Sequence, residues 1–442
     1  MIVKDLPNLV LSLQTLYHNL MFAIISKLRQ SEGLKHSVLT IFSYGLASAF
    51  SALAVILISR LLGPTSFADF SVAFSLSLIL NRLNDFGLSM VIQKIVGGEW
   101  RRPKINAYLS LILKYRLVIS ILLILLGLVF SGAISNYLQI SNQVLIPLTF
   151  LFSLSVTYFE SAQITLQSLG KFKIAAYNYL LPSFIKFSLA LIIFLLKITD
   201  VQLILVIYLL STLPSLLIAE FLKPKWIKYE LGQKFKKEQG KVLQLLKHSA
   251  FAIIAAGIIE NMDVLFAKHY LSSYEAGLLA GVNRIAMLLY VVAYALANVL
   301  NPRAATYKNR ANFDSFLKKA WGITALAVFA FFLSLPFAPL LIHWTIGPAY
   351  AGGSEILVVL LAAGFISIAL MPFIATFYAF KSNLYFSLSA ILQLVIVLVG
   401  NFYFVPKLGL TASVYTRLIA RIALLVFTWL MLWINYRREF KK

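Results

Sequence analysis

The sequence predicts an all-α integral membrane protein with about twelve transmembrane helices in two six-helix lobes around a central cavity. Hydrophobic residues make up 60% of the chain and charged residues only 12%, which is too little polar residue to cover a soluble globule of 442 residues. Apolar runs of about 20 residues, the length that crosses a hydrocarbon core, recur along the sequence. Basic residues gather in alternate connections between these runs.

The basic residues also predict an orientation. The even-numbered connections and the two termini hold 28 of the 39 Lys and Arg residues, whereas the odd-numbered connections hold 4. Because bacterial insertion retains basic loops in the cytoplasm, both termini are predicted to be cytoplasmic. The net charge of +23 follows from this topology and from contact with anionic headgroups, so membrane lipids are expected as partners and nucleic acid is not.

The first element is predicted to be an amphipathic interfacial helix within residues 1–36. Apolar residues such as Leu6, Leu9 and Leu13 recur at helical spacing over residues 6–28, with polar residues between them. Such a helix would lie on the inner membrane surface. The alternative is an extension that precedes the fold and has no ordered structure of its own.

Six spans follow in an N-lobe (37–222), then a basic cytoplasmic linker (223–246), six spans in a C-lobe (247–435) and a basic cytoplasmic tail (436–442). The twelve spans are predicted at 37–60, 69–91, 107–130, 144–168, 174–196, 201–222, 247–268, 277–299, 316–342, 354–378, 385–404 and 410–435. The two lobes echo one another weakly, and two repeats of six helices suit an alternating-access transporter. The alternative is that any two hydrophobic halves look alike.

The first connection has a recognisable sequence. Ser59-Arg60-Leu61-Leu62-Gly63-Pro64, with Asp85-Phe86-Gly87-Leu88 and Ile92-Gln93-Lys94-Ile95-Val96, resembles the opening of the Wzx-type polysaccharide flippases, members of the multidrug/oligosaccharidyl-lipid/polysaccharide exporter superfamily. The resemblance extends loosely over residues 37–435. It implies export of an undecaprenyl-pyrophosphate-linked oligosaccharide, such as an O-antigen unit of lipopolysaccharide, across a bacterial inner membrane. Other glycan-assembly membrane proteins would then be possible partners. Ala68 and Asp69 depart from the pattern, because a glycine is common at position 68.

Moving a pyrophosphate through the membrane requires a cationic, water-accessible cavity, because unsolvated charge is very costly there. Five basic residues inside spans are candidate substrate-binding residues: Arg82, Lys186, Arg284, Arg417 and Arg421. The last two lie four residues apart on one helix face, and guanidinium groups suit bidentate contact with phosphate. We expect Arg284, Arg417 and Arg421 to line a common space. The alternative for each candidate is an internal ion pair, as between Arg82 and Asp85.

Four acidic residues inside spans are candidates for ion coupling: Asp85, Glu160, Glu260 and Asp263. Glu260 and Asp263 lie three residues apart on one helix face, where two carboxylates are able to share a proton or hold a cation. The alternative is that each of the four neutralises a buried arginine.

Two other classes of function are alternatives: a membrane enzyme and a cation-coupled exporter. A membrane glycan polymerase or ligase would need catalytic residues on a sizeable outer loop, and the predicted outer loops are short. The sequence contains no cysteine, Gly-rich phosphate loop, metal-spaced His cluster or Ser-His-Asp arrangement, so no catalytic residue, metal or cofactor is expected. A cation-coupled drug or metabolite exporter of the same superfamily would favour an acidic and aromatic cavity over a cationic one.

Overall fold

The computed structural model describes residues 32–99, 101–233, 235–304, 310–380 and 383–440. Every regular element in these ranges is a helix, which confirms the predicted fold class. The interfacial helix predicted at residues 6–28 lies outside the described residues.

The helices follow the predicted spans closely. They are α2 (Glu32–Asp85), α3 (Leu88–Val91), the π-helical turn η1 (Ile92–Val96), α4 (Arg102–Val129), α5 (Ser131–Tyr137), α6 (Leu145–Ser168), α7 (Phe172–Leu196), α8 (Val201–Leu210), α9 (Leu213–Leu222), α10 (Lys236–Tyr270), α11 (Ser273–Ala304), α12 (Arg310–Ser334), the 3₁₀ turn η2 (Leu335–Phe337), α13 (Ala338–Thr345), the 3₁₀ turn η3 (Pro348–Gly353), α14 (Ser354–Ala379), α15 (Asn383–Leu408) and α16 (Leu410–Phe440). Eleven segments in the described part of the chain are long and apolar enough to cross a membrane.

The first of these segments accounts for two crossings. Its 44 residues would span about 66 Å as one straight helix, twice the roughly 30 Å of a hydrocarbon core. Gly63 interrupts α2 with a positive φ of 65°, directly before Pro64. Tyr44 from the first arm contacts Gln167 of α6, and Arg82 from the second arm contacts Glu160 of the same helix. The two arms therefore run antiparallel, so the eleven segments contain twelve passes long enough to span a hydrocarbon core in the described part of the chain.

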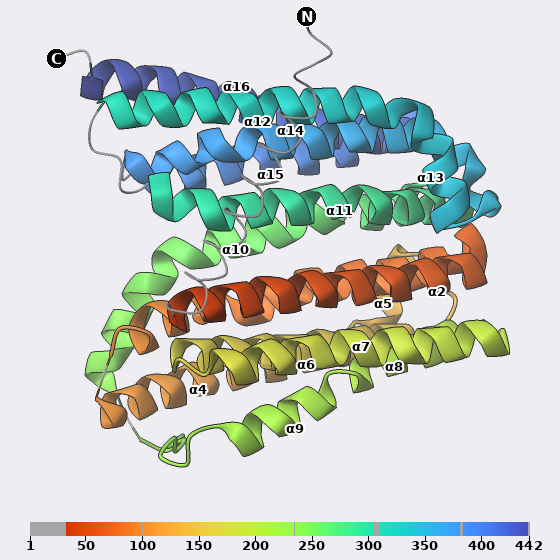
Figure 1. Cartoon of the computed structure of the whole chain (residues 1–442). Coiled ribbons are helices and arrows are strands. Elements are labelled where there is room, and N and C mark those ends of the chain that lie inside the picture. Colours follow the sequence, from red (N-terminus) through yellow and green to blue (C-terminus); the bar gives the residue numbers. More distant parts are fainter. Residues whose placement is uncertain (1–31, 100, 234, 305–309, 381–382, 441–442) are drawn as a thin grey trace, which may run out of the picture.

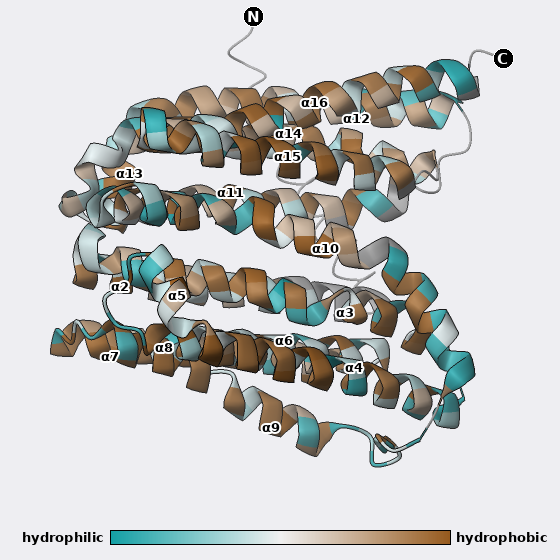
Figure 2. Ribbon diagram, turned by 180° about the vertical axis from the view of Figure 1, so that it is seen from behind, coloured by the Kyte–Doolittle hydropathy of each residue, from teal (hydrophilic) through white to brown (hydrophobic). Residues whose placement is uncertain are grey.

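The helices form two lobes that lie one above the other in Figure 1, with α2–α9 in one and α10–α16 in the other. The connection between α9 and α10 and the end of α16 lie at the same end of the molecule, which we call the linker end. The α13 end is the opposite one (Figure 1). Hydrophilic residues gather at the linker end and hydrophobic residues cover the helices between (Figure 2). Which end faces the cytoplasm stays a prediction, as do the domain boundaries.

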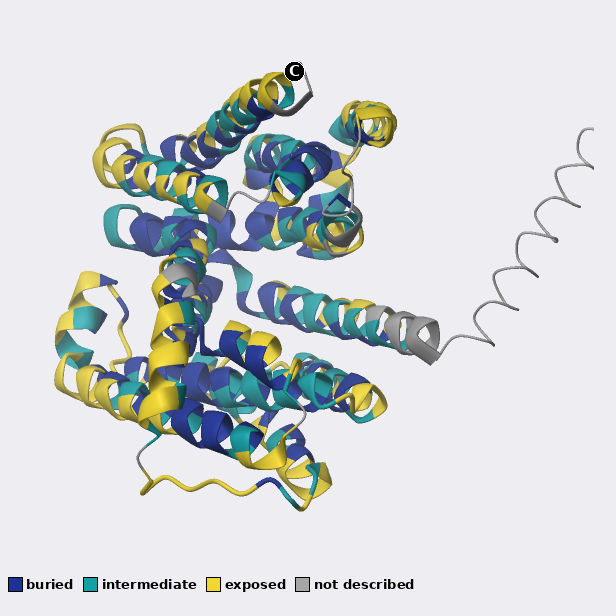
Figure 3. Cartoon of the chain, turned by 90° about the vertical axis from the view of Figure 1, so that its left-hand side faces the viewer, coloured by how far each residue is buried: buried dark blue, intermediate teal, exposed yellow. Residues whose placement is uncertain are grey.

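Seen along the helices, exposed residues lie on the outside of each lobe and buried residues line the inside (Figure 3). The exposed residues include many large apolar ones, such as Leu126 and Val129 of α4 and Phe329 and Phe332 of α12. This is the arrangement expected of helices that face lipid, because a soluble protein would expose polar side chains there.

Two of the boundaries that differ from the predicted ones have a local physical cause. The second span was predicted to run to residue 91, but α2 ends at Asp85 because Phe86 and Gly87 adopt positive φ angles of 46° and 84°. The seventh span was predicted to begin at 247, but α10 begins at Lys236, inside the predicted linker. Its early residues Val242 and Leu246 pack in a hydrophobic cluster with residues of α3 and α4, so burial extends the helix beyond the membrane-spanning run.

Candidate functional site in the membrane interior

Charged residues of the N-lobe pair across helices. Arg82 Nη1 lies 3.4 Å from Glu160 Oε2 of α6, and the two side chains are 39% and 30% exposed. Asp85 Oδ1 accepts a 2.8 Å hydrogen bond from Arg116 Nη2 of α4, and these side chains are only 2% and 4% exposed. The predicted alternative of an Arg82–Asp85 pair along α2 is not formed, because Asp85 ends the helix and its carboxylate is turned to Arg116 and Ser89.

Arg417 of the C-lobe is buried in an ion pair. Its Nη2 lies 2.6 Å from Asp263 Oδ2 of α10, with both side chains less than 10% exposed. Its Nη1 donates a 2.6 Å hydrogen bond to Asn283 Oδ1, and its Nη2 donates one of 3.0 Å to the carbonyl of Glu260. Arg417 and Asp263 therefore form the internal ion pair that was the alternative to a role in substrate binding. These contacts join α10, α11 and α16, so they hold the lobe together.

Glu260 and Asp263 differ in their partners, although they share a helix. The Glu260 carboxylate accepts a hydrogen bond from the Tyr294 hydroxyl of α11. It has no Lys or Arg within ion-pair distance in the described part of the chain. Glu260 is half-buried and Tyr294 is 51% exposed, so this carboxylate is accessible where that of Asp263 is not.

Three of the five candidate cations have no carboxylate within ion-pair distance among the residues described: Lys186, Arg284 and Arg421. Lys186 Nζ lies 5.6 Å from the ring centre of Tyr208. Arg421 donates a 2.7 Å hydrogen bond to Gln393 and lies over the ring of Tyr290. Both contacts of Arg421 are to the C-lobe helices around it.

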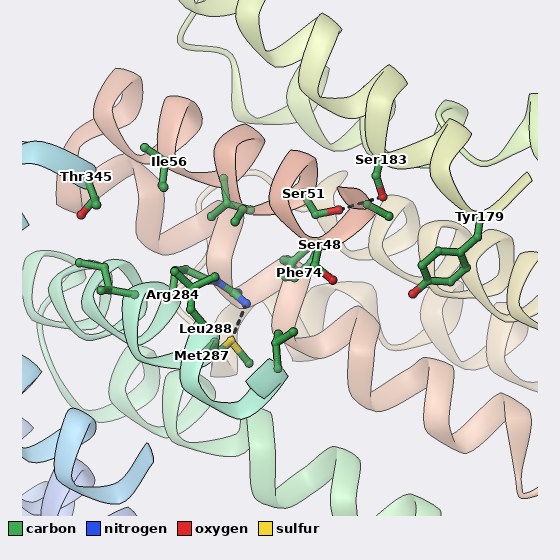
Figure 4. Close-up of a pocket in the computed structure, with 15 residues that line it drawn as sticks. Ser48, Ser51, Ile56, Phe74, Tyr179, Ser183, Arg284, Met287, Leu288 and Thr345 are labelled. Carbon is green, nitrogen blue, oxygen red and sulfur yellow. Dashed lines mark hydrogen bonds between the residues drawn. The ribbon is translucent and has the colours of Figure 1, made fainter. Parts of the chain in front are cut away.

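Arg284 lines a cavity of about 260 Å³ between the two lobes. The cavity is bounded by the first arm of α2, by α7 and by α11 (Figure 4). Its polar groups, apart from Arg284, are hydroxyls: Ser48, Ser51, Tyr179, Ser183 and Thr345. The remaining lining residues are apolar: Ala47, Ala52, Val55, Ile56, Phe74, Ile285, Met287, Leu288 and Val291. The cavity thus combines one cation with an apolar wall.

The Arg284 guanidinium uses little of its hydrogen-bonding capacity. It lies 4.7 Å from the ring centre of Phe74, and its Nη1 donates to the Met287 sulfur at 3.4 Å. Its Nε is buried and has no hydrogen-bond partner among the residues that the structure describes. A guanidinium carries five N–H donors, and a thioether is only a weak acceptor. Most of the Arg284 donors are therefore not used by acceptors among the described residues.

The expectation of a common space for three arginines is not met in this cavity. Arg284 lines it, whereas Arg417 and Arg421 are not among its lining residues. Arg417 is turned to Asp263 and Arg421 to Gln393, so the helix face that they share on α16 packs against its own lobe.

Two charged residues in the interior were not predicted as interior residues from the sequence. Arg116 was not named as a candidate, although it interrupts an apolar span and this was the available signal. Lys268 was counted with the outer connections, but it is 2% exposed and its Nζ lies 2.7 Å from Asp69 Oδ1. This pair also gives a role to Asp69, which departs from the family pattern.

The sequence matches the model of a family described as polysaccharide biosynthesis protein over residues 34–308, more than half of the chain. No curated protein matches the sequence. The earlier resemblance to Wzx-type flippases is confirmed by the family match and by the fold of the following structures.

Several solved structures share the fold, and three of them illustrate it. A multidrug resistance MATE family transporter of the MOP superfamily, in an inward-facing conformation, has a TM-score of 0.69 at 15% identity, covering 91% of this chain and 100% of its own. The lipid II flippase MurJ, in an inward closed conformation, has a TM-score of 0.71 at 14% identity, covering 90% of this chain and 87% of its own. A MOP superfamily transporter from Pyrococcus furiosus has a TM-score of 0.53 at 15% identity, covering 90% of this chain and 94% of its own.

Proposed function

We propose, since the chain belongs to the polysaccharide biosynthesis protein family, that it flips an undecaprenyl-pyrophosphate-linked oligosaccharide from the cytoplasmic to the periplasmic leaflet of a bacterial inner membrane. The chain is a multi-pass membrane transporter rather than an enzyme. We propose further the cargo that it carries, the direction of transport and the membrane in which it lies. It places the protein in the synthesis of a surface polysaccharide such as an O-antigen of lipopolysaccharide, beside other glycan-assembly proteins.

The observation that carries this proposal is the cavity around Arg284. One guanidinium with unused donors suits a pyrophosphate, and the apolar wall suits the first part of a polyprenyl chain. The serine, threonine and tyrosine hydroxyls are suitable partners for sugar hydroxyls. No carboxylate lines this cavity, which argues against the alternative of a cation-coupled drug exporter.

The proposal is tested by expressing the chain in flippase-deficient bacterial strains that each build a different lipid-linked glycan. We expect surface glycan to return in at least one strain, because a substrate that fits the cavity would again reach the outer leaflet. Surface glycan is measured per amount of inserted protein, and the same strains are tested for efflux of cationic dyes. Dye efflux that depends on an ion gradient, with no surface glycan in any strain, would favour the exporter instead.

The structure also sharpens the choice between the two carboxylates of α10. We propose that Glu260 couples transport to a cation, since it is accessible and has no Lys or Arg within ion-pair distance among the described residues, whereas Asp263 neutralises Arg417. Glu260→Gln should make glycan export insensitive to collapse of the proton or sodium gradient while the protein stays inserted. Asp263→Asn should instead lower the amount of folded protein, because Arg417 would lose its counter-charge. Full gradient dependence in Glu260→Gln would disprove this role of Glu260.

A further inference from the structure

The two lobes are joined by specific contacts at the α13 end. The Tyr350 hydroxyl of η3 donates a 3.0 Å hydrogen bond to the carbonyl of Ser59 in α2. Lys268 of α10 forms its ion pair with Asp69 of α2 in the same region. The backbones themselves touch, because a Cβ atom added at Gly277 would lie 1.7 Å from the Pro64 carbonyl oxygen. This end of the path between the lobes is therefore closed.

Arg60 makes three of the hydrogen bonds that join the lobes at this end. It ends the first arm of α2, and its guanidinium donates hydrogen bonds to the carbonyls of His343 (3.1 Å), Trp344 and Thr345, the last residues of α13. These carbonyls form the C-terminus of a helix, which carries a partial negative charge and attracts a cation. Gly347 follows these carbonyls with a positive φ of 99°, a conformation that favours glycine, and it lies beside the arginine stem.

Arg60 differs from the buried cations in two respects. Its side chain is exposed, and in the described part of the chain no carboxylate lies within ion-pair distance of it. Its acceptors are neutral carbonyls, whereas hydrogen bonds from a guanidinium to an anionic oxygen are roughly twice as strong as neutral ones. An anion that reaches Arg60 therefore competes favourably for its donors.

The cavity leads to this arginine. Thr345, whose carbonyl accepts from Arg60, is also a lining residue of the cavity that contains Arg284. Ile56, one helical turn before Arg60, lines it too. In Figure 4, Thr345 and Ile56 lie on one side of Arg284 and Tyr179 on the other. An anion held at Arg284 is thus in a cavity lined by one of the residues whose carbonyls hold Arg60.

We propose that Arg60 is an anion-released latch, which holds the lobes together at the α13 end and lets go when a pyrophosphate takes over its donors. This inference rests on the proposed function, because it assigns the release step to the same cargo. A ligand shifts a conformational equilibrium only by its differential affinity for the two states. Arg60 supplies that difference, since its donors are occupied by α13 in the closed state and are available to the anion in the open one.

The latch is tested on the purified full-length chain in lipid nanodiscs. Because the chain has no native cysteine, Ser59→Cys introduces a single thiol at a position that is 0% exposed in the closed end. The rate of labelling by a hydrophilic maleimide reports opening. Adding Arg60→Gln should raise this rate at least about tenfold, which corresponds to roughly 1.4 kcal/mol. Arg60→Lys should give an intermediate rate, because it keeps the charge and loses the planar fork.

Inorganic pyrophosphate serves as the anion probe. It should raise the labelling rate of the Ser59→Cys chain that retains Arg60 and leave that of the Arg60→Gln chain unchanged. Lys197→Gln, which removes an exposed cation at the end of α7, is the matched control and should behave like the chain with Arg60. If Arg60→Gln is not recovered folded, Arg60→Lys takes its place in the test. Its increase in labelling rate on adding pyrophosphate is compared with that of the Lys197→Gln control. An increase equal to that of the control would overturn the proposal.

An unchanged labelling rate in Arg60→Gln would overturn the latch. An equal pyrophosphate response in Arg60→Gln would overturn release by the anion. Both measurements omit the lipid-linked glycan, so they are independent of the glycan-export assay. A latch that behaves as described in a chain that restores no surface glycan would refute the cargo and leave the latch standing.

Discussion

Replacing Arg116 with methionine is expected to lower the free energy of unfolding by about 3–5 kcal/mol, because Asp85 would remain buried without its counter-charge. The double variant Arg116→Met/Asp85→Asn should recover most of the loss, since it removes both charges. The measurement is the thermal stability of the purified chain in detergent, followed by the amount of monodisperse protein that remains after heating.

The exposed pair of Arg310 and Asp314, with side chains 59% and 39% exposed, provides the control for Arg116. Arg310→Met should change the stability far less, because water solvates the exposed Asp314 carboxylate. A single variant Arg116→Met as stable as the original chain would show that the ion pair of Arg116 and Asp85 is not a structural element of the N-lobe.

Replacing Arg284 with glutamine is expected to reduce glycan export at least about tenfold, a loss of roughly 1.4 kcal/mol in binding of the transported anion. The amount of inserted protein should stay close to that of the original chain, because Arg284 neutralises no carboxylate in the described structure. Arg284→Lys should rescue export only partly, since an ammonium keeps the charge but loses bidentate geometry. Export is measured as surface glycan per amount of inserted protein.

Arg417→Gln is the informative comparison for Arg284. It should lower the amount of folded protein, because Asp263 would lose its partner at 2.6 Å. The two arginines were predicted as equivalent cavity residues, and their different partners separate them. Export at the original level in Arg284→Gln would rule out the cationic-cavity mechanism.

The helices were predictable because each is encoded locally. An apolar run of sufficient length reports a span without reference to any other part of the chain, and Gly63-Pro64 marks the bend between the first two. The start of α10 was not predictable in this way. Residues 236–246 are rich in lysine, and they are helical because Val242 and Leu246 find apolar partners in the other lobe.

The ion pairs were less predictable than the helices, because each depends on how two helices are rotated against one another. Sequence spacing suggested Asp85 for Arg82, but the partner is Glu160, 78 residues away along the chain. In the same way, nothing in the sequence distinguishes Arg284 from Arg417. Each directly follows a polar residue, Asn283 or Thr416, within an apolar span. Only the packing of α10, α11 and α16 assigns Asp263 to Arg417 and leaves Arg284 in the cavity.

The uncompensated charge of Arg284 has an electrical consequence. In an energised membrane that is negative inside, each elementary charge moved across the full voltage changes energy by about 2.3 kcal/mol per 100 mV. A cavity that holds one positive charge when empty and a pyrophosphate when loaded has opposite signs of charge on the two halves of a transport cycle. Under the proposed function, the voltage then draws the empty site towards the inside and drives the loaded site outward, so the arginine proposed to bind the cargo would make both movements favourable.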